Sequence, residues 1–174
     1  MLLTNVLSVV ALGAATVLAD GKAIMAAMNT IKADTAHLGA TVASWRGDLL
    51  GVLAIAGESF GLLDDLKKGS RTADRSAPLT QDEALAIATV TADLATEVNK
   101  TLSAIIVAKP RFDRLLIVSP IILINLEAQQ KATADFSAKV VAKVPKDLQA
   151  IAQSLIQPIN DAFKKAIARY QIRL

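Results

Sequence analysis

The sequence contains no cysteine and only one histidine, His37, and each shortage excludes a kind of chemistry. Without cysteine the chain has no disulfide, no thiol nucleophile and no thiolate metal site. A single histidine leaves no histidine pair for a zinc ion. We therefore expect neither a metal nor a cofactor, and the classes that remain are binding functions and hydroxyl or carboxylate chemistry.

Aromatic residues are also scarce, at 3% of the chain, although 53% of its residues are hydrophobic. The apolar content is mostly alanine, leucine, isoleucine and valine, which favours packed helices over a β-sandwich. The net charge is +3, but nineteen basic and sixteen acidic residues are interspersed. Because the basic residues are not interleaved with aromatic ones, we expect no nucleic-acid partner.

The N-terminal segment MLLTNVLSVVALGAATVLAD carries no charged side chain before Asp20. It is shorter than the run of about 20 strongly apolar residues that a membrane-spanning helix needs. Val17-Leu18-Ala19 fits the small-x-small pattern of a signal-peptidase site. We therefore predict a signal peptide at residues 1–19, a single secreted domain at residues 20–174 and no membrane span. The alternative is a buried first helix of a cytosolic protein.

Apolar residues at alternating spacings of three and four predict an all-α fold, an antiparallel bundle of four to five helices after the cleaved signal peptide. Three helices are expected at 22–45, at 49–75 and from the capping box Thr80–Glu83 to the break at Lys109-Pro110. A short turn around Phe112 and Leu115 follows. The last two helices are expected to start at Ser119-Pro120 and after 144–147, and Pro158 lies inside the final one.

The third helix carries the sequon Asn99-Lys100-Thr101, which is a candidate glycosylation site in a secreted chain. Asn99 falls off the expected buried stripe of that helix and is therefore predicted to be accessible.

The stretch Gly57-Glu58-Ser59-Phe60-Gly61 matches G-x-S-x-G, the nucleophile elbow of α/β-hydrolases. That motif needs a strand before it, a helix after it and a later histidine. Here it lies within a helical pattern and the only histidine comes earlier. The favoured interpretation is that two small residues four apart allow close helix packing, and a hydrolase with Ser59 as nucleophile is a distant alternative.

Three polar residues, Gln129, Thr133 and Ser137, share a helix face with apolar core residues. Buried polar groups need hydrogen-bond partners. They either bond to backbone, to one another or to a neighbouring helix, or they line a cavity and meet the polar head of a ligand.

Two isoleucines, Ile121 and Ile124, point away from that core face. Either they form an exposed patch that adsorbs to a hydrophobic surface, or the 110–118 turn covers them, which is the expected arrangement for Ile121.

The segment PLTQDEALAIATVTADLATEVNKTLSAIIVAKPRFDRL, followed by NLEAQQKATADFSAKVVAKVPKDLQAIAQSLIQPINDAFKKAIARY, resembles the fungal hydrophobic-surface-binding protein A (HsbA) and antigenic cell-wall galactomannoprotein family. The resemblance covers nearly the whole predicted mature chain and rests on the order and spacing of the segments. It implies a secreted, often mannosylated helical domain with no catalytic motif. Some members adsorb to hydrophobic polymer surfaces and help to recruit secreted esterases, and others hold a fatty acid among their helices. Because no Ser/Thr-rich stalk or anchor signal follows the last helix, covalent attachment to the cell wall is not expected.

Two functions follow from these observations. The leading one is a secreted, non-enzymatic module that sequesters a long-chain fatty acid or similar amphiphile, with Gln129, Thr133 and Ser137 as candidate head-group donors. The predicted cavity wall consists of core-face residues of four helices: Ile31, Leu38, Leu94, Val98, Ile122, Leu126, Phe136, Leu155 and Phe163. The alternative is a surface-active extracellular or cell-wall protein that adsorbs through Ile121 and Ile124.

Overall fold

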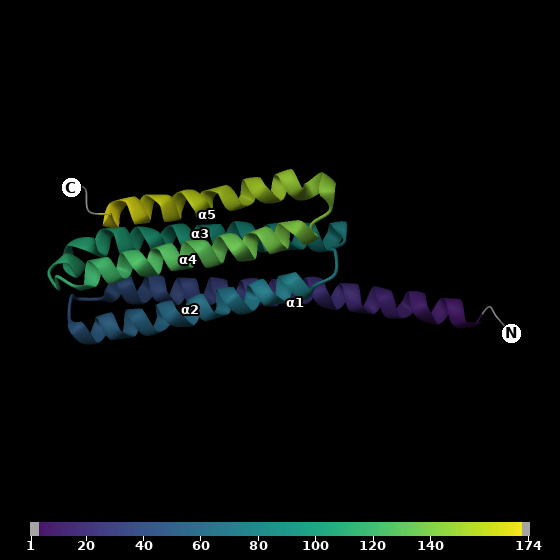
Figure 1. Cartoon of the computed structure of the whole chain (residues 1–174), viewed down its shortest axis with the longest axis horizontal. Helices are drawn as coiled ribbons and strands as arrows, with labels where there is room; N and C mark the ends of the chain where they lie inside the picture. The colour runs from purple at the N-terminus through teal and green to yellow at the C-terminus, as the bar shows by residue number, and fades with distance from the viewer. Residues whose placement is uncertain (1–3, 172–174) are drawn as a thin grey trace.

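The computed structural model describes the chain over residues 4–171, and side chains over residues 20–171. The predicted all-α antiparallel bundle is confirmed, with five helices and no strand in the described part (Figure 1). The helices are α1 (Thr4–Ser44), α2 (Leu49–Arg75), α3 (Gln81–Asp113), α4 (Val118–Lys143) and α5 (Gln149–Tyr170), and a short 3₁₀ helix, η1 (Lys146–Leu148), precedes α5. The predicted signal peptide, 1–19, lies outside the residues whose side chains are described, so its cleavage stays a prediction.

The helices enclose one apolar core along the length of the bundle. α1 packs against α2 and α3, α4 packs against α2 and α5, and α5 also packs against α3. Fully buried side chains from several helices meet in this core, including Ile24, Leu38, Phe112, Leu126 and Ile159. Burying side chains of this size contributes about 1.5–3 kcal/mol each before the loss of conformational entropy.

The start of α3 follows the predicted capping box. Thr80 N–H donates to Glu83 Oε2 at 2.9 Å, and Glu83 N–H donates to Thr80 Oγ1 at 3.3 Å. These bonds satisfy backbone donors that a helix N-terminus otherwise leaves unpaired.

The α3–α4 connection differs from the sequence prediction in two ways. α3 does not end at Pro110 but continues to Asp113, because Phe112 is fully buried and stacks on Trp45 with ring centroids 4.3 Å apart. The proline lies in the last turn, where it removes only one backbone hydrogen bond. Ser119 does not cap α4, which begins at Val118; its hydroxyl donates to Asp113 instead, at 2.6 Å.

The first half of α5 is held differently from the rest of the bundle. No side chain from 149 to 158 is fully buried, and the buried residues of α5 begin at Ile159. Pro158 lies at the boundary between the two halves. Among the described residues, one side-chain hydrogen bond joins α5 to another helix, and it is near the C-terminal end: Tyr170 Oη donates to Ile105 O at 2.7 Å.

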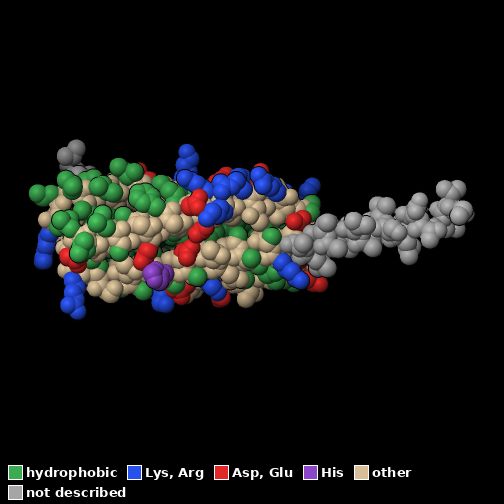
Figure 2. Space-filling view, turned by 90° about the horizontal axis from the view of Figure 1, so that it is seen from below, with side chains coloured by type: hydrophobic (Ala, Val, Ile, Leu, Met, Phe, Trp, Pro, Cys, Tyr) green, Lys and Arg blue, Asp and Glu red, His purple; other side chains and the backbone are tan. Residues whose placement is uncertain are grey.

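Large apolar side chains are exposed at the end of the bundle that holds the α1–α2 and α3–α4 connections (Figure 2). Ile121 is 53% exposed and Ile124 is 67% exposed, so the expectation that the 110–118 turn covers Ile121 is wrong. The turn cannot cover it because its own Leu116 and Ile117 also face solvent. The exposed residues, which we call the apolar end, are Leu49, Leu50, Leu53, Leu116, Ile117, Ile121 and Ile124.

Candidate functional site

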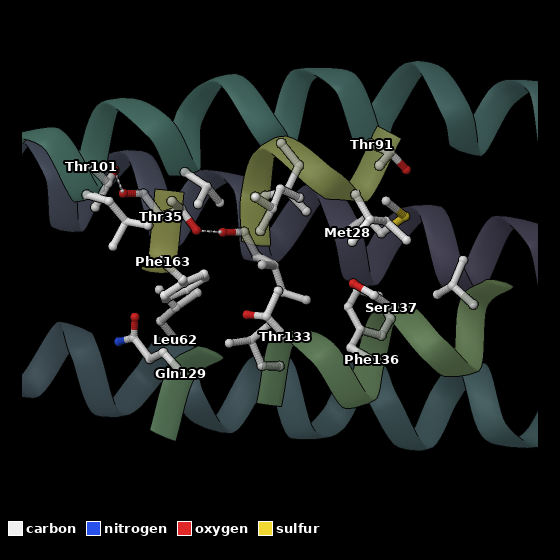
Figure 3. A pocket seen from close by; sticks show the side chains of 18 residues that line it. Met28, Thr35, Leu62, Thr91, Thr101, Gln129, Thr133, Phe136, Ser137 and Phe163 are labelled. Atoms are coloured by element: carbon white, nitrogen blue, oxygen red, sulfur yellow. Dashed lines mark hydrogen bonds between the residues drawn. The ribbon is translucent and has the colours of Figure 1, made fainter. Parts of the chain in front are cut away.

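A cavity lies inside the bundle, and all five helices contribute to its wall (Figure 3). No lysine, arginine, histidine or carboxylate lines it, so its interior is apolar except for hydroxyls and one amide. The lining residues are Met28, Ile31, Thr35, Leu62, Leu66, Thr91, Leu94, Val98, Thr101, Leu102, Gln129, Thr133, Phe136, Ser137, Val140, Ile156, Ile159 and Phe163. We call this the inner cavity.

A second cavity adjoins the inner one between α3, α4 and the first half of α5. The two share Thr91, Val140 and Ile156 as a common wall. Their free volumes are about 50 Å³ and about 60 Å³. About 10–15 Å³ of such volume holds one water molecule, so each cavity as it stands has room for a few waters. A long acyl chain therefore requires the helices to move apart.

The predicted wall residues are only partly brought together. The inner cavity is lined by five of the nine, namely Ile31, Leu94, Val98, Phe136 and Phe163. Leu155 lines the second cavity. The remaining three, Leu38, Ile122 and Leu126, line neither cavity.

The helical pattern explains this difference. It identifies which side chains face the core, and Leu38 and Leu126 do so at 1% and 2% exposure. It does not identify where along the core the packing leaves a gap. Met28, which lines the inner cavity, was missed for the same reason. Leu62 and Ile156 were missed because the spacing predicted other side chains of α2 and α5 for the core face.

The three predicted head-group donors all line the inner cavity but are engaged differently. Gln129 Nε2 donates to Ser59 Oγ at 2.7 Å, across to α2, and to Asn125 Oδ1 at 3.0 Å, within α4, so both of its N–H groups are engaged. The hydroxyls of Thr133 and Ser137 make no hydrogen bond to another described residue. They are the hydroxyls that a ligand can use without breaking an existing bond.

The other threonines of the cavity wall are tied to the backbone. Thr35 and Thr91 donate to Ile31 O and Ile87 O, each one turn back in its own helix, at 2.6 and 2.8 Å. Thr101 donates across the helix interface to Thr35 O, at 2.7 Å. Their hydroxyls therefore serve the bundle itself.

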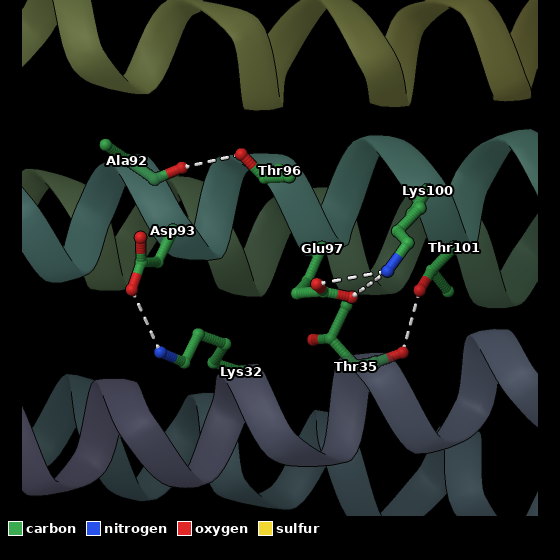
Figure 4. A network of polar contacts seen from close by, with 8 residues as sticks. All are labelled: Lys32, Thr35, Ala92, Asp93, Thr96, Glu97, Lys100 and Thr101. Atoms are coloured by element: carbon green, nitrogen blue, oxygen red, sulfur yellow. Dashed lines mark hydrogen bonds and ion pairs between the residues drawn. The ribbon is translucent and has the colours of Figure 1, made fainter.

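The α1–α3 side of the cavity is closed by polar contacts (Figure 4). Besides the Thr101–Thr35 bond, Lys32 Nζ lies 3.2 Å from Asp93 Oδ2 across the same interface. The α2–α4 side is joined by Ser59 with Asn125 and Gln129, and by Ser70 with Asp135. In the described part of the chain, no side-chain hydrogen bond or ion pair joins α4 to α5. The α4–α5 seam is therefore the wall that lacks polar contacts.

Ser59 does not sit in a nucleophile elbow. It lies in the middle of α2, is 8% exposed, and its hydroxyl donates to Asn125 Oδ1 at 2.6 Å. His37 instead approaches Glu58, with Nδ1 3.1 Å from Oε1. The expected packing role of the flanking glycines is also wrong, since a Cβ added at Gly57 or Gly61 would meet no atom within 4 Å. The physical reason is that both glycines lie on the outer side of α2, which no other helix covers.

The charged groups near the bundle ends serve structure. Lys109 Nζ lies 2.8 Å from Asp113 Oδ1, and this bond together with the Ser119 hydroxyl lowers the pKa of Asp113. Burial raises the pKa of Tyr170.

Within the residues described, no cluster of three or more His, Cys, Asp or Glu side chains could hold a metal ion, and no helix is long and apolar enough to cross a membrane.

Comparison with known proteins identifies the family. The family model described as hydrophobic surface binding protein A (HsbA) matches residues 21–142, and the chain belongs to this family. Among curated proteins, no sequence matches it significantly.

Solved structures share its fold. The crystal structure of AFMP4P in complex with palmitic acid matches with a TM-score of 0.83 and 25% identity, covering 87% of this chain and 99% of that one. Ligand binding domain 1 of the Penicillium marneffei MP1 protein, complexed with arachidonic acids, matches with a TM-score of 0.83 and 20% identity over 88% and 99% of the two chains. Domain 2 of the same protein, with multiple arachidonic acids, gives 0.81 and 21% over 87% and 96%.

Proposed function

We propose that this member of the hydrophobic surface binding protein A family sequesters a long-chain fatty acid or a similar amphiphile between its helices. The observation that carries the proposal is the inner cavity, which is apolar, free of charged side chains and equipped with two hydroxyls that the bundle does not use. Structures with the same fold hold palmitic acid and arachidonic acid, which supports an acyl ligand here.

Burial of the acyl chain supplies the binding energy. Each methylene removed from water contributes about 0.8 kcal/mol, so ten contribute about 8 kcal/mol before the costs of association. Part of this energy is used to separate the helices, because the cavities are small without a ligand. Affinity should therefore rise with chain length until the enlarged cavity is filled. The chain acts by binding, and no catalytic step is assigned to it. We therefore expect no hydrolytic activity in the parent protein, and none in Ser59→Ala.

The test is a matched pair of substitutions on α3. Val98 lines the inner cavity and is 7% exposed, whereas Val107 on the same helix is 69% exposed. Val98→Phe should fill the cavity and weaken palmitate binding at least tenfold, while Val107→Phe should bind like the parent protein. Circular dichroism and thermal unfolding establish that both variants are folded. Equal affinities for the two variants would refute binding at this cavity.

We also propose that the chain is secreted, and either released or held in the cell wall, after cleavage behind Ala19. A buried carboxylate supports this site. Glu83 is 8% exposed, and its Oε1 has no hydrogen-bond partner among the described residues. A Cβ placed at Gly21 would overlap this oxygen, so residue 21 lies directly against it. Cleavage would leave the new ammonium on Asp20, next to an acceptor that lacks a donor.

N-terminal sequencing of the secreted protein is expected to give Asp-Gly-Lys, and a sequence that begins at Met1 would contradict the proposal. Asn99 is exposed on α3, which is compatible with a glycan there. A mass shift on treatment with an N-glycosidase, absent in Asn99→Gln, tests that part.

A second function, adsorption to hydrophobic surfaces, is favoured by the apolar end. Its seven large apolar residues are each more than half exposed, and large exposed patches of this kind mark interaction sites. Recruitment of a secreted esterase to the coated surface belongs to this second proposal. Replacing both Ile121 and Ile124 with Ser should reduce adsorption to polystyrene or polyester beads but spare palmitate binding in solution. Unchanged adsorption would rule out this placement.

A further inference from the structure

Three hollows of the bundle meet at one side chain, that of Ile156. It lines the inner cavity, the second cavity and an outer groove on the α4–α5 surface. Among the described residues, no other side chain lines all three. Ile156 is therefore part of the wall between the two cavities, with Thr91 and Val140, and also part of the wall between each cavity and the outer groove.

The helices around Ile156 are held together by few contacts. The first half of α5 has no fully buried side chain and, among the residues that the structure describes, makes no side-chain hydrogen bond or ion pair to another helix. Pro158 removes the backbone hydrogen bond that would join the two halves of α5 at that point. On the α4 side, the outer groove is lined by Val141 and by four small residues, Ala134, Ser137, Ala138 and Ala142, so few bulky side chains of α4 interlock with α5 there.

The outer groove also provides amide and hydroxyl groups for a ligand's polar head, whereas most such groups of the cavity interior are already engaged. Ser137 lines both the groove and the inner cavity, and the amide side chains of Gln153 and Asn160 line the groove. Neither amide makes a hydrogen bond to another described residue, whereas Gln157 already donates to Asp161 Oδ1 at 2.9 Å. These groups supply neutral N–H and O–H donors at a place that water reaches.

We propose that the α4–α5 seam is the entrance of the site, with Ile156 as its gate and the outer groove as the head-group subsite for a long-chain carboxylate. The inference rests on the proposed function and adds the route, the orientation and the residues that control them. The acyl tail displaces Ile156 and occupies the inner and second cavities, which merge once that side chain has moved. The carboxylate stays in the groove, against the Ser137 hydroxyl and the amides of Gln153 and Asn160.

The orientation follows from desolvation. The inner cavity holds no cation, and Gln129 has no free N–H, so a carboxylate placed there would meet at most two hydroxyls. An ionised group that loses its hydration without adequate partners is destabilised by more free energy than a few buried methylenes return. The reverse arrangement, with tail inside and carboxylate at the seam, avoids that penalty.

The absence of native cysteine allows a direct test. Ala138 and Gln157 both line the groove, one on each helix, and neither is assigned to the head group. In the double variant Ala138→Cys/Gln157→Cys, a cleavable bifunctional thiol reagent crosslinks α4 to α5 and holds the seam closed. Stopped-flow association of a fluorescent fatty acid should slow at least a hundredfold in the crosslinked protein and recover fully once the link is cleaved. An unchanged association rate in the crosslinked protein would overturn the proposed entrance.

Single substitutions provide a second readout. Ile156→Ala removes the gate, so the association rate should rise at least fivefold, while Val107→Ala on the exposed surface of α3 leaves it unchanged. Ser137→Ala and Asn160→Leu should each weaken palmitate binding several-fold but leave the binding of hexadecane, which has no head group, unaltered. Equal losses for palmitate and hexadecane would overturn the head-group subsite. Absence of any palmitate binding in the parent protein would instead refute the proposed function itself.

Discussion

Two threonines of the cavity wall provide an informative comparison, because their hydroxyls are engaged in opposite ways. Thr101 Oγ1 donates to Thr35 O across the α1–α3 interface at 2.7 Å. Thr133 lies on the opposite wall, 9% exposed, with a hydroxyl that bonds to no other described residue. Replacement of each by valine keeps the branched shape and removes only the hydroxyl. The two substitutions should therefore have opposite effects on stability without ligand.

The magnitudes follow from the contacts. Thr101→Val loses a net hydrogen bond worth about 1 kcal/mol and leaves Thr35 O without that partner, which adds to the loss. The new methyl group also cannot approach an oxygen as closely as 2.7 Å, so the helices must shift slightly. Thr133→Val instead removes a partly desolvated hydroxyl that has no partner, and should stabilise the unliganded protein by about 0–1 kcal/mol. With an m-value of about 2 kcal/mol/M, a difference of about 1–2 kcal/mol separates the urea midpoints by about 0.5–1 M.

The assay is urea unfolding of the delipidated variants, followed by circular dichroism, together with palmitate titration of the same samples. Thr133→Val should be at least as stable as the parent and unfold at higher urea than Thr101→Val. Its palmitate affinity should fall only modestly, since the carboxylate is placed at the seam and not at Thr133. If Thr133→Val lost as much stability as Thr101→Val, the hydroxyl of Thr133 would have a structural partner and the description of the cavity wall would be wrong.

Three further predictions concern the frame around the cavity. Gly51→Ala should destabilise the bundle and change Trp45 fluorescence, because its Cβ would overlap the indole ring, whereas Gly57→Ala, with no atom within 4 Å, should stabilise by about 0.5–1 kcal/mol in thermal unfolding. Tyr170→Phe should cost about 1 kcal/mol in urea unfolding by leaving Ile105 O without its donor, and an unchanged midpoint would show that water replaces it. Hydrogen bonds from Lys109 and Ser119 lower the pKa of Asp113 in the folded protein. The ionised Asp113 carboxylate therefore stabilises the fold above the unfolded pKa of about 4, and this stabilisation is lost as the pH falls below that value. Asp113→Asn should accordingly lower the melting temperature at pH 7 but not at pH 2.

The sequence was sufficient for the helices and for most of their ends. Alternating spacings located α2 and α5 closely, and the Thr80–Glu83 capping box fixed the start of α3. It failed at Pro110 and Ser119, where local rules predicted a helix end and a cap. There, the burial of Phe112 against Trp45 carried α3 past the proline, and Asp113 took the Ser119 hydroxyl. Tertiary contacts outweighed local preference at both positions.

The candidate site was less predictable, for a different reason. Periodicity gives the direction of a side chain around its helix, and this was correct for Ile31, Leu94 and Val98. A cavity forms where facing side chains do not fill the space between helices, and the pattern of a single helix does not contain that information. Nor did the pattern indicate Ile156, whose importance lies in lining both cavities and the outer groove at once.

The exposed end of the bundle shows what the sequence could anticipate about the surface. The helical spacing placed Ile121 and Ile124 away from the core face of α4, and both are exposed. The spacing did not indicate that Leu49, Leu50 and Leu53 of α2 are exposed at the same end, because their exposure depends on which faces of α2 the neighbouring helices cover. The apolar end is therefore a feature of the fold more than of any one segment.

Native mass spectrometry tests the central claim most directly. The secreted protein is measured as purified, after delipidation, and again after exposure to a mixture of fatty acids of different chain lengths, with Val98→Phe measured in parallel. The account predicts a discrete adduct of one or two fatty acids that disappears on delipidation, returns on exposure and is lost in Val98→Phe. If the parent protein forms no adduct while hydrophobic beads still deplete it from solution, binding between the helices is refuted and the apolar end carries the function.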